Sequence, residues 1–283
     1  MLICLPDGVI RAIPRPATDL KGSLPAGRPA HAPLRVSIHE DTAAAKEDAC
    51  RGAHWRDGDP AAGGEGAMDY GRARQEVMEA VHQIRQLGLS WGTSGNASLR
   101  VPETGDVAIT PSALAYEVME ATDVAVVDRH GMLIEGRYRP SSEMPMHLCV
   151  YRNRKEVGGI VHTHSTWATA LACLGEEIPA VHYLIALVGP RVPLAAYAAY
   201  GTDELGESVV QALGTSQAVL MQNHGVLAVG RTLGDAVTVA ATVEYVAAVY
   251  SHARSLGTPI ILPDEEIARL RTRFAAYRPE RLA

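Results

Sequence analysis

Two histidines separated by a single residue, His162 and His164, end a short apolar segment of the chain. Side chains two positions apart on a β-strand point to the same face, so both imidazoles can bind one metal ion. A third histidine, His224, follows another apolar run and precedes Gly225, which permits a tight turn. The fold must therefore bring a strand end and a separate turn together around an open three-histidine site. Such a site suits zinc and leaves a position for water or substrate.

A single buried histidine is more often a hydrogen-bonded core residue than a metal ligand, so each histidine needs a second feature in its support. His162 and His164 support each other through their shared face. Four other histidines have no second ligand at strand spacing, and we interpret them as structural. These are His130, His147, His182 and His252. Glu143, at the end of a Ser-Ser-Glu segment, supplies a carboxylate that could move a proton beside a metal ion.

The composition excludes several classes of partner. The chain has 283 residues, a formal net charge of −6 and a pI near 6.0, with no long run of lysine or arginine, so neither nucleic acid nor an anionic membrane is an expected partner. We find no signal-peptide pattern and expect no apolar run long enough to span a membrane. The four cysteines show no close pairing motif. A cytoplasmic location is therefore expected.

Residues 1–67 differ from the rest of the sequence. They are rich in proline, glycine, alanine and charged residues and show little periodicity, which is typical of an extension of low order. Met68 directly precedes a regular amphipathic pattern, so translation starting there is a hypothesis. The intact mass of the native protein tests it, because a mass that includes residues 1–67 would exclude the hypothesis. The remaining 68–283 form the predicted folded domain.

Periodicity within 68–283 predicts alternating strands and helices. Helical patterns occupy 70–87, 146–152, 166–173, 204–213, 233–256 and 265–277. Strand-like runs occupy 97–101, 107–110, 124–127, 132–135, 159–164 and 218–222. The short turn-like connection at 128–131 indicates antiparallel pairing. Together these patterns predict a mixed α/β layer fold without internal repeats.

Three hydroxyl-bearing turns, at 92–98, 110–113 and 141–142, carry no net charge but offer backbone N–H groups, hydroxyls and an amide. This is the chemistry of an anion-binding nest. The third turn opens a predicted helix, whose positive end favours phosphate. A purely structural alternative stays open for Ser141, which could cap that helix.

The order of these motifs resembles the class II aldolase/adducin family. The matching motifs are Gly92-Thr93-Ser94-Gly95-Asn96, Thr110-Pro111-Ser112, Ser141-Ser142-Glu143 with His147, His162-Thr163-His164 and Asn223-His224-Gly225. The resemblance spans 68–283. Within the family, the stretch 178–185, the segment around Tyr197 and 201–205, and the C-terminal 274–277 are most similar to the L-fuculose-phosphate aldolases.

The resemblance implies a three-layer α/β/α fold with a mainly antiparallel central sheet and one zinc ion per subunit. It implies that His162, His164 and His224 bind the zinc, and that Glu143 completes the resting coordination before acting as general base. The residues that it implies for the substrate phosphate are Thr93, Gly95, Asn96, Ser112, Ala113, Ser141 and Ser142. Ala113 stands where this subfamily usually has glycine, so the phosphate loop is expected to differ in shape.

The resemblance also implies a homotetramer with active sites at subunit interfaces. Tyr183 would reach the site of a neighbouring subunit and donate a proton to the aldehyde oxygen. Tyr277, in the C-terminal tail, would lie over the site. The tetramer and the roles of these two tyrosines rest on the family resemblance alone.

The expected activity is zinc-dependent, reversible cleavage of L-fuculose 1-phosphate, or a similar deoxyketose 1-phosphate, into dihydroxyacetone phosphate and a small aldehyde such as lactaldehyde. Covalent imine catalysis is not expected, because Lys155 is the only lysine after Lys46 and lies at a polar end of a predicted helix. Within the same family the alternatives are an L-ribulose-5-phosphate 4-epimerase and a sugar-acid-phosphate decarboxylase or dehydratase. A non-catalytic module like the adducin head is a third class, which the presence of all three histidines disfavours.

Overall fold

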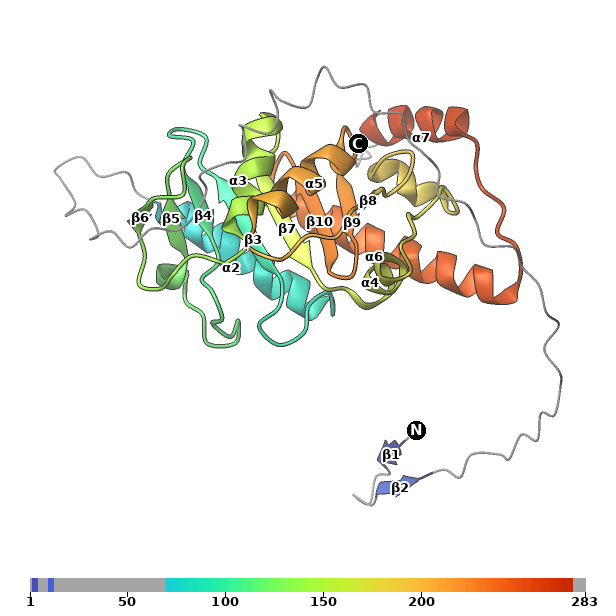
Figure 1. Ribbon diagram of the computed structural model, residues 1–283, viewed down its shortest axis with the longest axis horizontal. Coiled ribbons are helices and arrows are strands. Elements are labelled where there is room, and N and C mark those ends of the chain that lie inside the picture. Colours follow the sequence, from blue (N-terminus) through green and yellow to red (C-terminus); the bar gives the residue numbers. More distant parts are fainter. Residues whose placement is uncertain (1, 5–9, 13–69, 277–283) are drawn as a thin grey trace, which may run out of the picture. The chain divides into compact units, whose positions relative to one another are not determined.

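The computed structural model describes residues 2–4, 10–12 and 70–276 of the chain (Figure 1). The chain divides into two compact units, Met1–Glu40 and Asp41–Ala283. In the first unit, strand β1 (Leu2–Cys4) pairs antiparallel with β2 (Ile10–Ala12). The predicted domain boundary at residue 67 and the proposed start at Met68 fall outside the described residues, so both stay predictions.

An eight-stranded sheet forms the centre of the second unit, in the order β6-β5-β4-β3-β7-β10-β9-β8. Its strands are β3 (Asn96–Arg100), β4 (Val107–Ile109), β5 (Ala125–Val127), β6 (Leu133–Glu135), β7 (Gly159–Thr163), β8 (Leu194–Ala195), β9 (Ala218–Met221) and β10 (Gly225–Gly230). Every neighbouring pair is antiparallel except β8 and β9, which are parallel. The predicted, mainly antiparallel sheet is confirmed.

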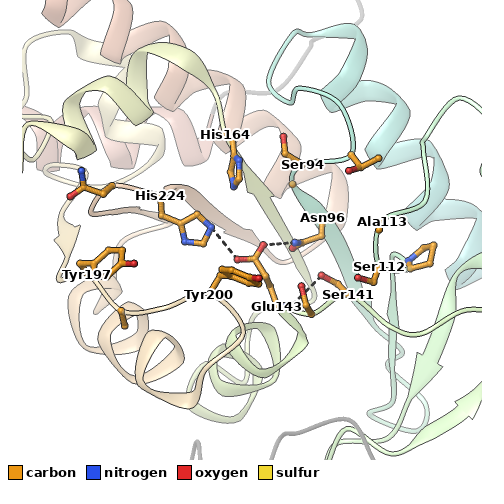
Figure 2. A pocket seen from close by; sticks show the side chains of 16 residues that line it. Ser94, Asn96, Ser112, Ala113, Ser141, Glu143, His164, Tyr197, Tyr200 and His224 are labelled. Carbon is orange, nitrogen blue, oxygen red and sulfur yellow. Dashed lines mark hydrogen bonds and ion pairs between the residues drawn. The ribbon is translucent and has the colours of Figure 1, made fainter. Parts of the chain in front are cut away.

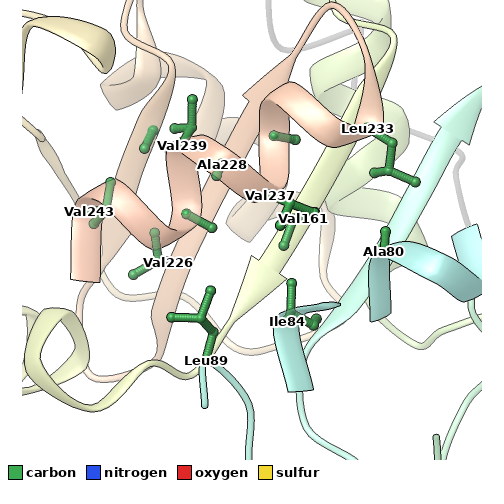
Figure 3. Close-up of a cluster of buried hydrophobic side chains, with 14 of the residues drawn as sticks. Ala80, Ile84, Leu89, Val161, Val226, Ala228, Leu233, Val237, Val239 and Val243 are labelled. Carbon is green, nitrogen blue, oxygen red and sulfur yellow. The ribbon is translucent and has the colours of Figure 1, made fainter. Parts of the chain in front are cut away.

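Helices cover both faces of this sheet. They are α2 (Gly71–Gln86), α3 (Met144–Asn153), α4 (Thr166–Cys173), α5 (Asp203–Leu213), α6 (Leu233–Leu256) and α7 (Asp264–Ala276), with short 3₁₀ helices η2 (Ala121–Asp123) and η3 (Tyr183–Leu187). Successive strand residues alternate between two buried clusters. Val161 of β7 packs with residues of α2 and α6, whereas its neighbour Ile160 packs with α3 and α5. Figure 3 shows the first cluster, with Ile84 of α2 and Val243 of α6. The result is the three-layer α/β/α arrangement.

Helix α6 lies along this first face and begins at a well-defined cap. Thr232 Oγ1 accepts the Asp235 N–H, and the Asp235 carboxylate accepts the Thr232 N–H, so two otherwise unpaired donors are satisfied. Among the described residues α6 is the one helix long and apolar enough in composition to cross a membrane, contrary to the expectation from sequence. Half of its most apolar segment is buried, however, and its buried side chains pack in the core, as expected of a central helix of the fold.

The predicted helices agree closely with the structure, but two strands were not predicted. Helices 166–173 and 233–256 have the predicted bounds. Strand β10 and the two-residue strand β8 were missed, although β10 occupies a central position beside β7. The helix expected to open at the Ser-Ser-Glu turn begins at Met144, with Glu143 at its N-cap position. Ser141 Oγ accepts the Glu143 N–H at 3.2 Å, so Ser141 stabilises the preceding turn and is not the cap itself.

Candidate active site

The three histidines predicted to bind metal lie together at one end of the sheet, on the face covered by α3 and α5. His162 belongs to β7, His164 directly follows that strand, and His224 lies in the turn between β9 and β10. Antiparallel pairing of β7 with β10 brings this turn to the end of β7. Glu143, at the N-cap position of α3, points toward the same place (Figure 2).

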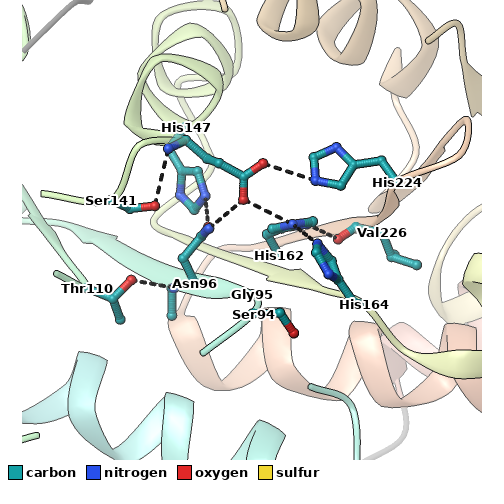
Figure 4. A network of polar contacts seen from close by, with 12 residues as sticks. Ser94, Gly95, Asn96, Thr110, Ser141, His147, His162, His164, His224 and Val226 are labelled. Atoms are coloured by element: carbon teal, nitrogen blue, oxygen red, sulfur yellow. Dashed lines mark hydrogen bonds and ion pairs between the residues drawn. The ribbon is translucent and has the colours of Figure 1, made fainter. Parts of the chain in front are cut away.

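The side-chain atoms of these four residues converge closely. The Nε2 atoms of His162 and His164 are 2.9 Å apart, and one potential ligand atom from each of the three histidines lies within 4.8 Å of the others. Glu143 joins them through both oxygens. Its Oε2 is 3.1 Å from His162 Nε2, and its Oε1 is 3.1 Å from His224 Nε2 (Figure 4).

Two glycines make this convergence possible. A Cβ at Gly225 would lie 2.4 Å from the Thr163 carbonyl oxygen and 2.9 Å from His164 Cδ2, so a larger residue would displace the turn that carries His224. A Cβ at Gly95, where φ is +81°, would lie 2.8 Å from the His162 carbonyl oxygen. Both positions therefore need glycine for close backbone approach.

The electrostatics of the cluster favour an ionised carboxylate among neutral and partly protonated imidazoles. Burial opposes ionisation of Glu143, but the close imidazoles of His162 and His224 outweigh it and hold the carboxyl pKa well below its usual range. Burial opposes protonation of His162, yet Glu143 raises the His162 pKa. At His164, burial and the two neighbouring imidazoles lower the pKa to about 4.

These groups fit a divalent cation. His162 Nδ1 lies 2.9 Å from the Val226 carbonyl oxygen, to which a neutral ring donates its proton, leaving the Nε2 lone pair directed at the cluster. Without a cation, that lone pair is satisfied only if His164 carries a proton on its Nε2, 2.9 Å away. Glu143 Oε1 is buried and makes no hydrogen bond despite its approach to His224. A positive ion among these atoms would satisfy all of them.

A cavity of about 310 Å³ opens beside the cluster. His164, His224 and Glu143 line one part of it, and all residues that sequence analysis expected at the substrate phosphate line another part. These are Thr93, Gly95, Asn96, Ser112, Ala113, Ser141 and Ser142. Three separate turns therefore meet at one cavity.

The phosphate side of the cavity offers neutral donors. No lysine or arginine is among the described residues that line it. The backbone N–H groups of Gly95, Ala113 and Ser142 have no acceptor within the described part of the chain. Ala113 has a φ of 57°, a left-handed conformation that glycine adopts without strain, which gives a physical reason for the glycine expected at this position.

Of the two predicted catalytic tyrosines, Tyr183 lies within the described residues and outside this cavity. Tyr183 begins η3, is 48% exposed and stacks on Phe274 at a ring-centroid distance of 6.1 Å. It does not line the cavity of its own chain. Tyr277 lies just beyond the described residues, and its predicted role stays a prediction.

Sequence analysis gave no functional role to several residues that line the cavity. Tyr197, Ala198 and Tyr200 come from the segment between β8 and α5, and Asn223 precedes His224. Asn223 has a φ of 54°, and asparagine before a histidine-glycine pair was an available signal for a left-handed turn. Figure 2 shows Tyr197 on the His224 side of the cavity and Ser112 on the other. The two tyrosines are 64% and 71% exposed and belong to no periodic pattern.

The family model described as the class II aldolase and adducin N-terminal domain matches residues 75–251. This chain belongs to that family. It is a class II aldolase, an enzyme of the lyase class. Class II aldolases depend on a metal ion, and in this one His162, His164 and His224 form the site that could hold it.

Curated relatives with aldolase activity cover most of the folded part of this class II aldolase. It is 40% identical over 206 residues to a 5-deoxy-D-ribulose 1-phosphate aldolase of Bacillus thuringiensis, covering 73% of this chain and 97% of that protein. It is 38% identical to a 5-methylthioribulose-1-phosphate/5-deoxyribulose-1-phosphate aldolase of Rhodospirillum rubrum, covering 72% and 91%. It is 35% identical to the L-fuculose phosphate aldolase of Escherichia coli, covering 74% and 97%.

Solved structures agree with this assignment of the fold. An L-fuculose 1-phosphate aldolase matches with a TM-score of 0.71 and 39% identity, over 74% of this chain and 98% of that chain. A putative aldolase/epimerase/decarboxylase, YgbL from Escherichia coli, matches with a TM-score of 0.64 and 28% identity, over 72% and 100%.

Proposed function

We propose that this enzyme is a zinc-dependent aldolase that reversibly cleaves a deoxyketose 1-phosphate into dihydroxyacetone phosphate and a small aldehyde. The observation that carries the proposal is the convergence of three imidazole nitrogens and a buried carboxylate beside a cavity whose far side offers uncharged anion-binding groups. The names of the relatives support 5-deoxyribulose 1-phosphate and L-fuculose 1-phosphate as the first substrates to compare. Both substrates end in a methyl group beyond the bond that breaks.

His162, His164 and His224 would hold the zinc ion, with Glu143 as a fourth ligand in the resting enzyme. When bound, the zinc supplies positive charge that stabilises the negative charge developing on the substrate as the carbon–carbon bond breaks. Imine chemistry would need a lysine in the cavity. The only lysine among the described residues is Lys155, which is exposed after the end of α3 and does not line it.

Glu143 would act as general base. In the direction of synthesis it takes a proton from C3 of dihydroxyacetone phosphate, and C3 then attacks the aldehyde carbon. In cleavage it returns that proton to C3 after the C3–C4 bond has broken. Its lowered pKa keeps it ionised at neutral pH, as a base requires.

The hydroxyl-bearing turns would bind the phosphate through the hydroxyls of Thr93, Ser112 and Ser142 and the backbone N–H groups of Gly95 and Ala113. The aldehyde portion would then extend toward Tyr197 and Tyr200. Their rings give that side of the cavity apolar surface, which suits a terminal methyl group.

We also propose a homotetramer in which Tyr183 of one subunit reaches the site of a neighbour and exchanges a proton with the aldehyde oxygen. The half-exposed position of Tyr183, outside its own cavity, supports this proposal. Light scattering after size-exclusion chromatography tests it, because a monomer would exclude any role across an interface. We propose a cytoplasmic location by analogy with the bacterial aldolases that the chain resembles.

The test of the activity is a coupled assay for dihydroxyacetone phosphate, run on protein of known zinc content. The substrates are 5-deoxyribulose 1-phosphate, L-fuculose 1-phosphate and, in parallel, L-ribulose 5-phosphate. Release from either 1-phosphate that is lost on chelation and restored by zinc supports the aldolase. Conversion of ribulose 5-phosphate alone would favour the epimerase alternative, and no reaction with any of the three would contradict the proposed substrate class.

A further inference from the structure

A chain of buried polar side chains runs from Glu143 into the layer between the sheet and α3, and Figure 4 labels two of its members, Asn96 and His147. Asn96 and Ser98 are two residues apart on β3 and so share a face. His147 and Tyr151 are four residues apart on α3 and also share a face. All four side chains are at most 4% exposed. Sequence analysis assigned His147 only a structural role and gave none to Ser98 or Tyr151.

The hydrogen bonds of this chain can run in only one direction. Glu143 Oε2 is a carboxylate oxygen and accepts, so the Asn96 group 2.8 Å away is the NH₂. Asn96 Oδ1 therefore faces His147 Nε2 at 2.6 Å and must accept from it. His147 Nδ1 is left to accept the Ser98 O–H at 2.7 Å.

Tyr151 fixes the far end. Because the single Ser98 hydroxyl proton is directed at His147, the Tyr151 O–H donates toward Ser98, whose Oγ and carbonyl oxygen lie 2.9 and 3.0 Å away. Burial lowers the pKa of His147 to about 3, which agrees with a neutral ring carrying one donor and one acceptor. Every donor from Tyr151 to Asn96 thus points toward Glu143.

We propose that His147 is a positioning residue: through Asn96 it fixes the orientation of the Glu143 carboxylate. This inference rests on the proposed role of Glu143 as base and resting metal ligand. If the Asn96 amide turned over, its carbonyl oxygen would face the carboxylate, and His147 would have to change tautomer against the Ser98 hydroxyl. The chain from Tyr151 to His147 prevents that rotation.

The same arrangement gives Asn96 two functions. One N–H of its NH₂ holds Glu143, and Asn96 also lines the cavity, where the second N–H can reach the substrate. Binding of substrate and orientation of the base therefore meet on one amide group. A histidine that merely filled the core would not influence either.

The test compares four variants of the full-length enzyme: H147L, H147Q, S98A and L148A. Leucine removes both hydrogen bonds of the imidazole, whereas glutamine keeps a donor and an acceptor. Leu148 is the matched control, because it is the next residue of the same helix and is 1% exposed but lies in the apolar cluster. The readouts are the zinc dissociation constant from competition with a chromophoric chelator, and kcat and KM at saturating zinc.

Removal of an outer-shell partner typically costs about 10–100-fold in metal affinity or activity, so we expect H147L to weaken zinc binding and lower kcat by about that factor. KM should change less than kcat, H147Q should recover much of both losses, and S98A should fall between H147L and the wild type. L148A should destabilise the fold yet keep the zinc affinity and kcat of its folded fraction.

A folded H147L variant with wild-type zinc affinity and kcat would overturn the proposal, and so would an L148A variant with the same losses as H147L. If H147L does not fold, nitrogen-15 histidine spectra of the metal-free wild type give an independent test. The proposal requires the Nε2–H tautomer at His147, and the Nδ1–H tautomer would overturn it. Zinc affinity and tautomer do not depend on the sugar, so a wild type that binds zinc but cleaves no ketose phosphate contradicts the proposed function alone.

Discussion

Asn96 lies directly opposite His162 in the antiparallel pairing of β3 with β7, and its amide donates to the carboxylate that also contacts His162. One register position of the sheet thus joins the anion-binding side of the cavity to the metal-binding side. A change at either residue should affect both sides.

Replacement of Glu143 by glutamine separates charge from shape. In E143Q the side-chain oxygen can still accept from Asn96, but the amide cannot take a proton. We expect kcat to fall by about 100-fold or more, in the range typical of a lost general base, while the three histidines keep the zinc. Steady-state kinetics with metal analysis of the same sample measure both. Unchanged turnover at full zinc content would refute the role of Glu143 as base.

Gly225 should be as necessary for metal binding as a ligand. In G225A the new Cβ would meet the Thr163 carbonyl oxygen at 2.4 Å, so the turn carrying His224 must move and zinc affinity should fall. Gly214 provides the comparison, since its φ is +50° but no atom lies within 4 Å of a built Cβ. G214A should cost about 1–3 kcal/mol of stability, because residues with a Cβ rarely adopt a φ of 50° with a ψ of −118°, and it should leave zinc binding intact. Equal zinc affinity in both variants would contradict this account.

Ala113 tests how the left-handed conformation affects the phosphate turn. In A113G the relief of about 1 kcal/mol of backbone strain is offset by the greater entropy of glycine in the unfolded chain, so stability should change by less than about 1 kcal/mol. In A113V a β-branched residue at a φ of 57° should destabilise the turn and raise KM for the phosphorylated substrate. Urea unfolding and KM measure the two effects. A valine variant with wild-type KM would show that the turn does not contact the phosphate.

His147 should make the metal-free protein less stable in acid. Burial lowers its folded-state pKa to about 3 from the ordinary value of 6.5. Between these values the unfolded chain binds the proton and the folded chain does not, so falling pH favours unfolding by up to about 1.4 kcal/mol per pH unit. H147Q lacks this pH-dependent contribution. As the pH falls from about 6.5 to about 3, the wild type should therefore lose its advantage in free energy of unfolding over H147Q. A difference that stays constant with pH would contradict a neutral buried His147.

Helices were predicted from sequence more reliably than strands, for a physical reason. Helix α6 keeps an apolar composition without proline over 24 residues, which is too long for a strand and is a strong signal. Strand β10 is six residues long, buried on both faces and bounded by Gly225 and Gly230, so it lacks the alternation that marks a half-buried strand. In the sequence these two glycines resemble turn residues. In the structure both are needed because neighbouring backbone leaves no room for a side chain.

The residues of the site also differ in how well the sequence predicts them. His162 and His164 could be grouped because strand geometry relates positions two apart. Tyr197 and Tyr200 could not be assigned to the cavity, because a segment without periodicity carries no information about which distant residues it meets. His147 could be interpreted as structural, but its partners Asn96 and Ser98 lie about fifty residues away in the chain. Pairings of that kind require the tertiary structure.

The two walls of the cavity differ in how tolerant they should be of mutation. The metal-binding wall is built on β7, whose residues are all buried between two other strands, so most changes there would also damage the core. The wall formed by Tyr197 and Tyr200 is an exposed segment, where substitutions cost little folding free energy. Mutations in this one loop can therefore change which aldehyde the enzyme accepts, while the metal centre stays unchanged. Selection for new substrates should therefore find its first successful variants in that segment.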